Sequence, residues 1–423
     1  MPKKYKLKNI INKSKKIKKN ILSESKNITN NSKKLDNILG INSKNEEEFY
    51  KDCTGYEYQP TVLPAVKNLY AIGDIHGDLK VAIDSLFLAK VIDKNYSSLV
   101  ENNIISKEVL NKISEKEGSE FTSEKVAKEI SENINWIGKD SVVVQVGDQV
   151  DRCRPKEKMC HEEGATIDDE PSDLLILYLM TFLDKKARVY NGKVISLFGN
   201  HELMQSFGNF NYVSKKNLDI FESKEDRINQ FDKGNKLAKF LACTRISAVI
   251  VGSNIFIHAG IIPNFIKKQK YGNKKKSREN LIKLNKLVRK YLLDKTSSKN
   301  IEYILKNRNS IFWTRILGNI PPNVNNNYHE CEKYLTPILE LYNCNNMIVG
   351  HTPQSFQSHN HGINTTCLNK KKNNSGLHRV DVGSSKAFQG FDNQFSETSE
   401  IMKERDIQVL KIENDKDIKI LKI

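Results

Sequence analysis

The 423-residue sequence has no long apolar run and few of the residues that mark unusual classes of chain. No segment comes near the roughly 20 consecutive apolar residues of a membrane-spanning helix, and the mean hydropathy is −0.55. Only 21 Gly and 10 Pro are present, which excludes collagen-like and low-complexity chains. The chain also lacks a Cys-x-x-Cys zinc motif. What remains is a globular chain long enough for one large domain or two modest ones.

The cysteines show no spacing that marks a disulfide framework. They are odd in number and scattered along the chain, at Cys53, Cys153, Cys160, Cys243, Cys331, Cys344 and Cys367. The N-terminal segment also lacks the apolar core of a secretory signal peptide. Together these absences predict an intracellular, cytoplasmic protein with mostly free thiols. For Cys153 and Cys160, which share one loop, two free thiols are expected, with a disulfide or a structural metal as alternatives.

Basic residues are in excess, with 68 Lys+Arg against 51 Asp+Glu and a net charge of +17. Residues 1–40 carry a local charge of +10 and residues 265–308 carry +12, so the remainder of the chain is at −5. The Lys-, Asn- and Ser-rich composition of the first segment predicts a disordered tail over residues 1–46. Such a tail allows nuclear import or contact with a polyanion or a membrane surface. A solvated tail with no dedicated partner is the simpler interpretation.

Apolar residues recur at helical spacing inside the second basic segment. Leu281, Leu284, Val288 and Leu292 alternate with Lys and Arg, which predicts an amphipathic helix docked by one face with its basic face in solvent. A helix lying on a membrane surface has the same pattern and is the alternative. Residues 265–308 are one of three predicted insertions, and the other two are residues 94–135 and 153–170.

Five predicted strands each open onto a loop that carries Asp, Asn or His. They lie in the segments KNLYAIGDIHGDLK, SVVVQVGDQVDR, KVISLFGNHE, NIFIHAG and NMIVGHTPQ. Because α/β sheets build their sites at the carboxyl ends of strands, these polar groups are expected to gather at one edge of the sheet. Their donors are oxygen and nitrogen without thiolate, a mixture that suits two metal ions such as iron, zinc or manganese. Two ions about 3.5–4 Å apart need a bridging carboxylate.

In this order the motifs GDIHG, GDQVDR, GNHE, HAG and GHT resemble those of the calcineurin-like metallophosphoesterases, in particular the phosphoprotein phosphatase family. The surrounding sequence, with FWTR and RVDVGSSKAF, is similar to the bacterial-like, Shewanella-type branch and its relatives in large DNA viruses. The resemblance runs from about Leu69 to Phe388. It implies an α/β (α+β) metallophosphatase fold of four layers, a central β-sandwich of two mixed sheets flanked by helices. One catalytic domain is expected over residues 47–423.

The resemblance also implies a role for each motif residue. Asp74 and His76 would hold the first metal, Asp148 would bridge, and the second metal would be completed by Asn200, His258 and His351. Arg152 would grip the substrate phosphate with two parallel hydrogen bonds, and Arg315 would be a second phosphate-binding arginine. His201, paired with Asp151, would be the general acid that protonates the leaving oxygen. Asp381, after the last predicted strand, is interpreted as an ordinary strand-end carboxylate rather than a support of the site.

The resulting hypothesis is a phosphoesterase that depends on two metal ions and hydrolyses phosphomonoesters. Its expected substrate is a phosphoprotein or phosphopeptide carrying phosphoserine, phosphothreonine or phosphotyrosine. A hydroxide that bridges the metals would be the nucleophile, and the sequence contains no Ser or Cys nucleophile motif. Hydrolysis of a dinucleoside polyphosphate is the enzymatic alternative. An inactive binding protein of the same fold, tethered by its basic tail, is the alternative from another class.

Overall fold

The structure, a computed structural model, describes residues 44–115, 122–296, 298, 300–356, 362–369, 375–389 and 405–423. The chain divides into two compact units, Met1–Asp52 and Cys53–Ile423. The described part of the first unit contains a helix over residues 44–50. The predicted disordered tail, residues 1–46, lies outside the described residues except for its last three positions. All other elements belong to the second unit.

One sheet of the second unit is mixed and has the strand order β1-β6-β7-β8-β10-β9. The pairs β1/β6, β7/β8 and β8/β10 are parallel, whereas β6/β7 and β10/β9 are antiparallel. Its strands are β1 (Val62–Leu63), β6 (Ala248–Val251), β7 (Asn254–Ile257), β8 (Asn346–Val349), β9 (Asn364–Asn369) and β10 (Ser375–Arg379).

The other sheet has the order β12-β11-β2-β3-β4-β5. Strands β2 to β5 are parallel to one another, and β11 adds to β2 in the antiparallel direction. Parallel strands are buried on both faces, which explains their continuous apolar sequences. The strands are β2 (Asn68–Ile72), β3 (Val142–Gln145), β4 (Lys193–Leu197), β5 (Arg245–Ile246), β11 (Gln408–Glu413) and β12 (Asp417–Lys422).

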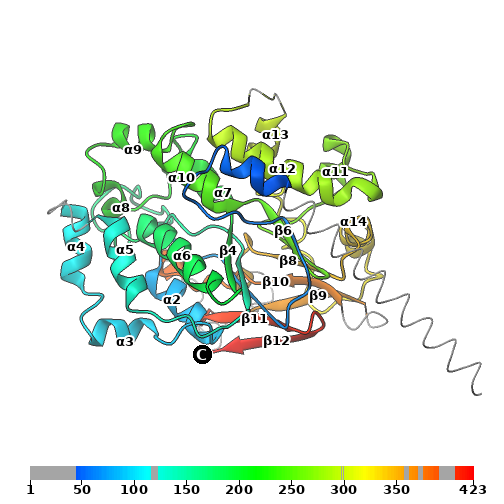
Figure 1. Cartoon of the computed structure of the whole chain (residues 1–423), viewed down its shortest axis with the longest axis horizontal. Helices are drawn as coiled ribbons and strands as arrows, with labels where there is room; N and C mark the ends of the chain where they lie inside the picture. The colour runs from blue at the N-terminus through cyan, green and yellow to red at the C-terminus, as the bar shows by residue number, and fades with distance from the viewer. Residues whose placement is uncertain are drawn as a thin grey trace, which may run out of the picture. The chain divides into compact units, whose positions relative to one another are not determined.

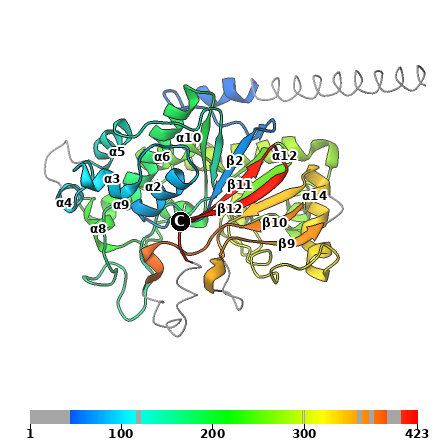
Figure 2. The same ribbon diagram turned by 90° about the horizontal axis from the view of Figure 1, so that it is seen from below.

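The two sheets pack face to face around one hydrophobic core. Val249, Phe256 and Ile348 of the first sheet join Val144 and Ile195 of the second in a single buried cluster. Figures 1 and 2 show the strands between helices α2 to α6 on one side and α12 and α14 on the other. The prediction of a β-sandwich of two mixed sheets flanked by helices is therefore confirmed.

Helices cover the outer faces of the sandwich. Helix α2 (Leu79–Leu88) contacts β11, α6 (Asp173–Arg188) contacts β4, and α12 (Ser277–Leu292) contacts β5 and β6. The remaining α-helices are α3 (Tyr96–Glu101), α4 (Lys107–Glu115), α5 (Ser123–Glu132), α7 (Asn200–Gln205), α8 (Lys215–Asp219), α9 (Lys224–Phe231), α10 (Lys236–Thr244), α11 (Pro263–Gln269), α13 (Ile301–Lys306) and α14 (Thr336–Tyr342). Short helical turns are η2 (Lys274–Lys276), η3 (Cys331–Leu335) and η4 (Gln354–Phe356).

Helix α12 is the amphipathic helix predicted in the second basic segment. Leu281, Leu284, Val288 and Leu292 are buried, whereas Lys283 is exposed, so the prediction of a helix docked by one face is confirmed. Residues 94–135 contain α3, α4 and α5. The assignment of residues 94–135, 153–170 and 265–308 as insertions stays a prediction. No helix in the described ranges is both long and apolar enough to cross a membrane.

The prediction of mostly free thiols is wrong. Cys53–Cys243, Cys153–Cys160 and Cys331–Cys367 form disulfides, and the buried Cys344 takes part in none of them. The first and third join residues 190 and 36 positions apart, so only the folded chain brings their sulfurs together. Disulfides persist in oxidising environments. The predicted cytoplasmic location therefore loses its support from free thiols and stays a prediction.

Candidate active site

The motif residues lie directly after the carboxyl ends of five strands. Asp74 and His76 follow β2, Asp148 follows β3, Asn200 and His201 begin α7 after β4, His258 follows β7, and His351 follows β8. Three of these strands belong to one sheet and two to the other. The prediction that the residues gather is confirmed, but the prediction of a single sheet edge is wrong. They meet where the two sheets face each other, because the sandwich places both sets of strand ends side by side.

Asp148 is the residue that joins the two halves of this site. Its Oδ2 lies 3.3 Å from Nε2 of His258, 3.9 Å from Nε2 of His76 and 3.9 Å from Nε2 of His201. Two groups of buried donor atoms share it, one with His76 and His201 and the other with His258 and His351. A carboxylate common to two such groups is the arrangement that a bridging ligand requires.

The second group converges on His258. Its Nε2 lies 3.0 Å from Oδ1 of Asn200 and 3.2 Å from Nδ1 of His351. Its Nδ1 lies 2.9 Å from the carbonyl oxygen of Val146, and Nε2 of His351 lies 3.2 Å from that of Trp313. A carbonyl can only accept, so these outer ring nitrogens donate and the inner ones carry lone pairs. With Oδ2 of Asp148, which lies 3.3 Å from Nε2 of His258, four acceptor atoms face one another, which is a site for a cation or a proton.

His76 is oriented in the same way in the first group. Its Nδ1 lies 3.3 Å from the carbonyl oxygen of Val150, and its Nε2 lies 4.0 Å from Oδ2 of Asp74. Histidines that bind metals characteristically donate their second ring N–H to a carbonyl or carboxylate. The site thus has the outer hydrogen bonds expected of metal-binding histidines.

Asp74 is a buried carboxylate with incomplete hydrogen bonding. Its Oδ2 accepts the main-chain N–H of His351 at 2.9 Å; its buried Oδ1 accepts from no donor while both carboxylates are ionised, and the carboxyl of Asp381 lies close enough to share a proton with Asp74. Burial, together with the nearby carboxylates of Asp381 and Asp148, raises the pKa of Asp74 well above its usual value. Packing like charges in a buried site costs free energy unless a cation compensates them. An unpartnered oxygen at this position fits a metal ligand.

The pKa of Asp148 is shifted in the opposite direction from that of Asp74, because histidines surround it. Burial alone would raise the pKa of Asp148, but the imidazoles of His258, His201 and His76 lower it well below the usual value. Burial alone would lower the pKa of His258, and the Asp148 carboxylate outweighs burial and raises it. Asp148 therefore stays ionised, as a ligand shared by two cations must.

The backbone around these ligands is strained. His76, Asp148, Asp151 and His351 have positive φ angles of 44°, 53°, 74° and 67°, a conformation that costs free energy for residues other than glycine. Such outliers concentrate at functional sites. Here they lie in the three loops that follow β2, β3 and β8.

Glycine and glutamate neighbours support this backbone. A Cβ atom at Gly199 would collide with Oδ1 of Asp148, and one at Gly350 would collide with Oδ1 of Asp74. The buried Glu202 accepts main-chain N–H groups of Asp148 at 3.0 Å and Gly199 at 2.7 Å. The glutamate of the GNHE motif thus fixes the loop that carries Asp148.

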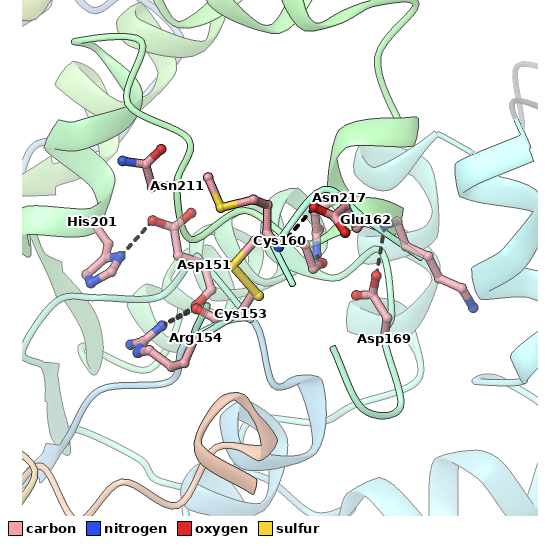
Figure 3. Close-up of a disulfide and its surroundings, with 12 residues drawn as sticks. Asp151, Cys153, Arg154, Cys160, Glu162, Asp169, His201, Asn211 and Asn217 are labelled. Atoms are coloured by element: carbon pink, nitrogen blue, oxygen red, sulfur yellow. Dashed lines mark hydrogen bonds and ion pairs between the residues drawn. A yellow bond between two sulfur atoms is a disulfide. The ribbon is translucent and has the colours of Figure 1, made fainter. Parts of the chain in front are cut away.

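His201 and Asp151 form a close pair beside the cluster. Nδ1 of His201 lies 2.6 Å from Oδ2 of Asp151, as Figure 3 shows. Gln205 donates to Oδ1 of the same carboxylate at 2.9 Å, and the buried Arg227 donates to Gln205 at 2.7 Å. This chain of hydrogen bonds leaves Nε2 of His201 directed at the cluster, where it can hold a proton or bind a cation.

The two predicted phosphate-binding arginines lie in different surroundings. The guanidinium of Arg152 is buried among protein groups and forms ion pairs with Glu170 at 3.1 Å and Asp78 at 3.4 Å. Arg315 is exposed and donates to the main-chain oxygen of His351 at 2.8 Å. Both arginines therefore donate to the main chain at the margin of the cluster, Arg315 to His351 and Arg152, at 2.8 Å, to Gly77, the residue after His76. Their predicted roles stay predictions.

Three residues at the site were not predicted as parts of it. Arg154 lies with Nη2 2.8 Å from Nε2 of His76. The ring of Tyr212 lies 5.1 Å from that of His201. Asp381 is buried, and its pKa is raised to about 6 by burial and by the Asp148 carboxylate. The sequence signal for Asp381 was the strand-end segment RVDVG, whereas Arg154 and Tyr212 stand in loops without a periodic pattern.

The chain matches the family described as calcineurin-like phosphoesterase over residues 67–355. It is 36% identical over 264 residues to an uncharacterized protein of Acanthamoeba polyphaga mimivirus, covering 57% of this chain and 98% of the relative. It is 24% identical over 388 residues to Shewanella-like protein phosphatase 2 of Arabidopsis thaliana, covering 81% and 77% of the two chains.

Solved structures show the same fold. A cold-active protein tyrosine phosphatase superposes with a TM-score of 0.52 at 20% sequence identity, covering 87% of this chain and 83% of that chain. The protein-tyrosine phosphatase of a psychrophilic Shewanella species superposes with a TM-score of 0.50, also at 20% identity, covering 86% and 83%. At this level of identity the likeness establishes the architecture and not the substrate.

Proposed function

The chain belongs to the calcineurin-like phosphoesterase family, and we propose that it is a metal-dependent phosphomonoesterase that acts on phosphoproteins. The observation that carries the proposal is the pair His201–Asp151, 2.6 Å apart, next to two donor groups that share Asp148. One part of this arrangement can bind cations and the other can hold a proton. Hydrolysis of a phosphate monoester needs both.

The metal ligands in this proposal are the six residues of the strand ends. Asp74 and His76 would hold the first ion, Asp148 would be shared, and Asn200, His258 and His351 would hold the second. The oxygen and nitrogen donors suit manganese, iron or zinc. Ions held there would supply a water nucleophile at neutral pH and compensate charge on the phosphoryl oxygens.

The protein's own contribution to the reaction is proton transfer at His201. Asp151 holds Nδ1–H, so Nε2 is the atom that can carry a second proton toward the departing oxygen. Gln205 fixes the orientation of Asp151. An alkoxide or phenoxide is a poor leaving group without a proton, so this histidine is assigned the role of general acid. His201 also belongs to one of the donor groups. The metal content of a His201 variant must therefore be measured alongside the activity of that variant.

A phosphoprotein is proposed as the substrate class on two grounds. The relatives with printed activities are a protein phosphatase and protein tyrosine phosphatases. The cluster is also flanked by the rings of Tyr212 and Phe388, which contact His201 and His76 respectively. These rings can pack against an apolar or aromatic side chain next to the phosphate.

A substrate panel tests the proposal. Purified protein, supplied with manganese, iron or zinc, is assayed on p-nitrophenyl phosphate, on phosphoserine, phosphothreonine and phosphotyrosine peptides, and on diadenosine tetraphosphate. We expect turnover of p-nitrophenyl phosphate and of at least one phosphopeptide. Preferential cleavage of diadenosine tetraphosphate would support the dinucleoside polyphosphate alternative instead. No turnover of any substrate with any of the metals would support an inactive binding protein.

Partners beyond the substrate are proposed from charge alone. The Lys-rich residues 1–46 and the basic face of α12 are proposed to contact a polyanion or an anionic membrane surface. An intracellular location, cytoplasmic with nuclear import through the tail, remains part of this proposal. Fluorescence imaging of the full chain and of a chain lacking residues 1–43 tests it, and an unchanged distribution would contradict a targeting role of the tail.

A further inference from the structure

A cavity that shares no residue with the strand-end cluster is lined by residues 54–59, α6 and α10. Its volume is about 400 Å³, a size typical of pockets that bind small molecules. Residues 54–59 precede the part of the chain that matches the family, which begins at residue 67. One wall of this cavity therefore lies outside the region that defines the family.

Aromatic rings form another wall of the cavity. The ring centroid of Phe240 lies 4.6 Å from that of Tyr178 and 6.1 Å from that of Tyr56. Tyr178 and Phe240 are buried, whereas Tyr56 is half-buried. Aromatic faces attract cations and stack against flat groups, and a guanidinium is both a cation and flat. This wall therefore suits a planar cation.

One of the three carboxylates at the cavity lacks a compensating cation. Asp184 and Glu57 pair with Arg188, at 2.7 and 3.8 Å. Glu124 is exposed and forms no ion pair with any residue in the described ranges. Burial, and after it the carboxylate of Glu124, raise the pKa of both Tyr56 and Tyr178, so the charge of Glu124 acts on the aromatic wall. Glu124 is thus available to a cation that binds in the cavity.

A buried acceptor without a donor belongs to the same lining. Gln59 is 7% exposed, and its Nε2 donates to Oδ2 of Asp184 at 2.7 Å. Because a carboxylate can only accept, this bond fixes which end of the amide is the oxygen. That oxygen, Oε1, is buried and has no hydrogen-bond partner. An unpaired buried acceptor is costly, and a ligand that donates an N–H to it would remove the cost.

Two lysines provide the opposite charge at the opening of the cavity. Lys185 and Lys236 line it, both are exposed, and neither forms an ion pair within the part of the chain that the structure describes. They can pair with a carboxylate. The cavity thus matches a ligand with a flat cationic end and a carboxylate at the other end.

A disulfide joins two walls of this cavity. Cys53 directly precedes residues 54–59, Cys243 lies in α10, and a covalent bond links the two buried side chains. The bond limits how far the two walls can move apart. A site that is held in shape before its ligand arrives loses less freedom on binding.

We propose that this cavity binds arginine, either the free amino acid or the C-terminal residue of a peptide. The guanidinium donates to Glu124 and to Oε1 of Gln59 while its face lies on the aromatic wall. The carboxylate pairs with the exposed lysines of the opening. A guanidinium can serve several acceptors in its plane and stack at the same time, which the ammonium of a lysine ligand cannot do. This site is separate from the proposed phosphomonoesterase site.

The first experiment compares arginine with two close analogues by calorimetry on the full chain. Citrulline replaces the guanidinium with a neutral urea of similar shape, and argininamide replaces the carboxylate with a neutral amide. We expect arginine to bind with a Kd below about 1 mM. Citrulline should bind at least about 10-fold more weakly, because it loses the charged hydrogen bonds to Glu124. Argininamide should bind roughly 3-fold more weakly, since exposed ion pairs contribute little.

Variants of exposed residues assign each end of the ligand without disturbing the core. Glu124→Gln is expected to lower the affinity for arginine about 10-fold and to leave that for citrulline unchanged. Lys236→Gln should weaken arginine but not argininamide. Glu129→Gln is the matched control, because Glu129 is exposed on the same helix and does not line the cavity. It should change neither affinity.

A peptide distinguishes the two sources of arginine. Gly-Gly-Arg with a free carboxylate keeps the guanidinium and the carboxylate but converts the α-ammonium of arginine to an amide. Binding of this peptide at least as tight as that of free arginine supports a peptide ligand. Binding at least about 10-fold weaker than that of arginine supports the free amino acid.

Three outcomes would overturn the assignment of the cavity. One is the absence of saturable binding of both arginine and the peptide up to about 10 mM. The others are equal affinities for arginine and citrulline, and an unchanged affinity for arginine in Glu124→Gln. None of these measurements involves turnover, so failure of the proposed phosphomonoesterase function and failure of this inference are separate results.

The second experiment tests the role of the disulfide. Cys53→Ser/Cys243→Ser is expected to weaken arginine binding about 10-fold, because its two walls are no longer joined. Cys331→Ser/Cys367→Ser removes a disulfide that does not line the cavity and should leave the affinity unchanged. Thermal unfolding of both variants shows whether each is folded at the temperature of the titration. Equal arginine affinities of two folded variants would contradict a role of Cys53–Cys243 in holding the cavity.

Discussion

The strand-end cluster and residues 149–172, the part of the β3–α6 loop that follows Asp148, adjoin each other at the site, yet they are built in opposite ways. In the cluster each ligand stands within four residues of a strand end, and a main-chain carbonyl orients each of His76, His258 and His351. The loop is held by side-chain contacts and by the Cys153–Cys160 disulfide. Metal binding should therefore depend on the cluster alone, and substrate binding and proton transfer on the loop and the residues that contact it.

Substitution of Asp148 gives the largest expected effect, because it removes the residue that both donor groups share. In Asp148→Asn the neutral amide cannot compensate two cations. We expect loss of both metals and a fall in turnover of about 10³-fold or more, since bound ions supply several kcal/mol of transition-state stabilisation. Elemental analysis and p-nitrophenyl phosphate turnover check this together. A variant that retains two metals would contradict the bridging assignment.

Substitution of His201 tests whether proton transfer can be lost while metal binding is kept. We expect His201→Ala to lower turnover by about 10²–10⁴-fold, the range typical of a general acid, while both metals remain bound. The loss should be smaller on a substrate whose leaving group has a low pKa, such as p-nitrophenol. If metal is lost and the residual activity follows the metal content alone, His201 is a ligand and not the acid.

A substitution that disturbs only the support of the loop should have a smaller effect. Gln205→Glu keeps an acceptor for Arg227 but replaces the amide that donates to Asp151 with a carboxylate. We expect roughly a 10-fold fall in turnover, the value of one hydrogen bond to a charged group, with unchanged metal content. Thermal unfolding of the same preparation serves as the control, because a large fall in Tm would make the activity loss uninformative about Asp151.

The cluster could be predicted from the sequence because its spacing is local. Each ligand stands a few positions after a buried apolar strand, as Asp148 does after VVVQ, and the geometry of parallel strands brings such ends together. The contacts that assemble the two sheets are long-range. Pairing of β11 with β2 joins residues such as Leu410 and Ala71, and no local pattern specifies it.

The loop could not be predicted because its contacts depend on tertiary structure. Arg152 and Arg154 have the same chemistry, and only the folded chain places Asp78 and Glu170 beside the first and Tyr212 and Phe388 beside the second. The disulfides were missed for the same reason, since seven scattered cysteines specify no pairing.

His378 provides a control that touches neither region and has the smallest expected effect on turnover. It is buried on β10, between Thr365 and Asn346, and burial lowers its pKa from 6.5 to about 4. The unfolded chain therefore binds a proton between these pH values that the folded chain does not. This group stabilises the fold above pH 6.5, and that contribution is lost as the pH falls toward 4. The difference corresponds to at most about 3 kcal/mol of unfolding free energy.

We expect His378→Gln to lose less stability than the wild type between pH 7 and pH 4.5. Urea unfolding at both values measures the difference, and comparison with the wild type cancels the titration of the site carboxylates. Metal content and turnover at pH 7 should be unchanged. An identical loss of stability in the two proteins would contradict the assignment of this pH dependence to His378.

The most direct test of the account is a metal titration of the metal-free protein, in which bound metal and phosphomonoester turnover are measured in the same samples. The account predicts no turnover without metal and full turnover as bound metal approaches two ions per chain, with Asp148→Asn inactive throughout. Undiminished turnover of the metal-free wild-type protein would contradict it.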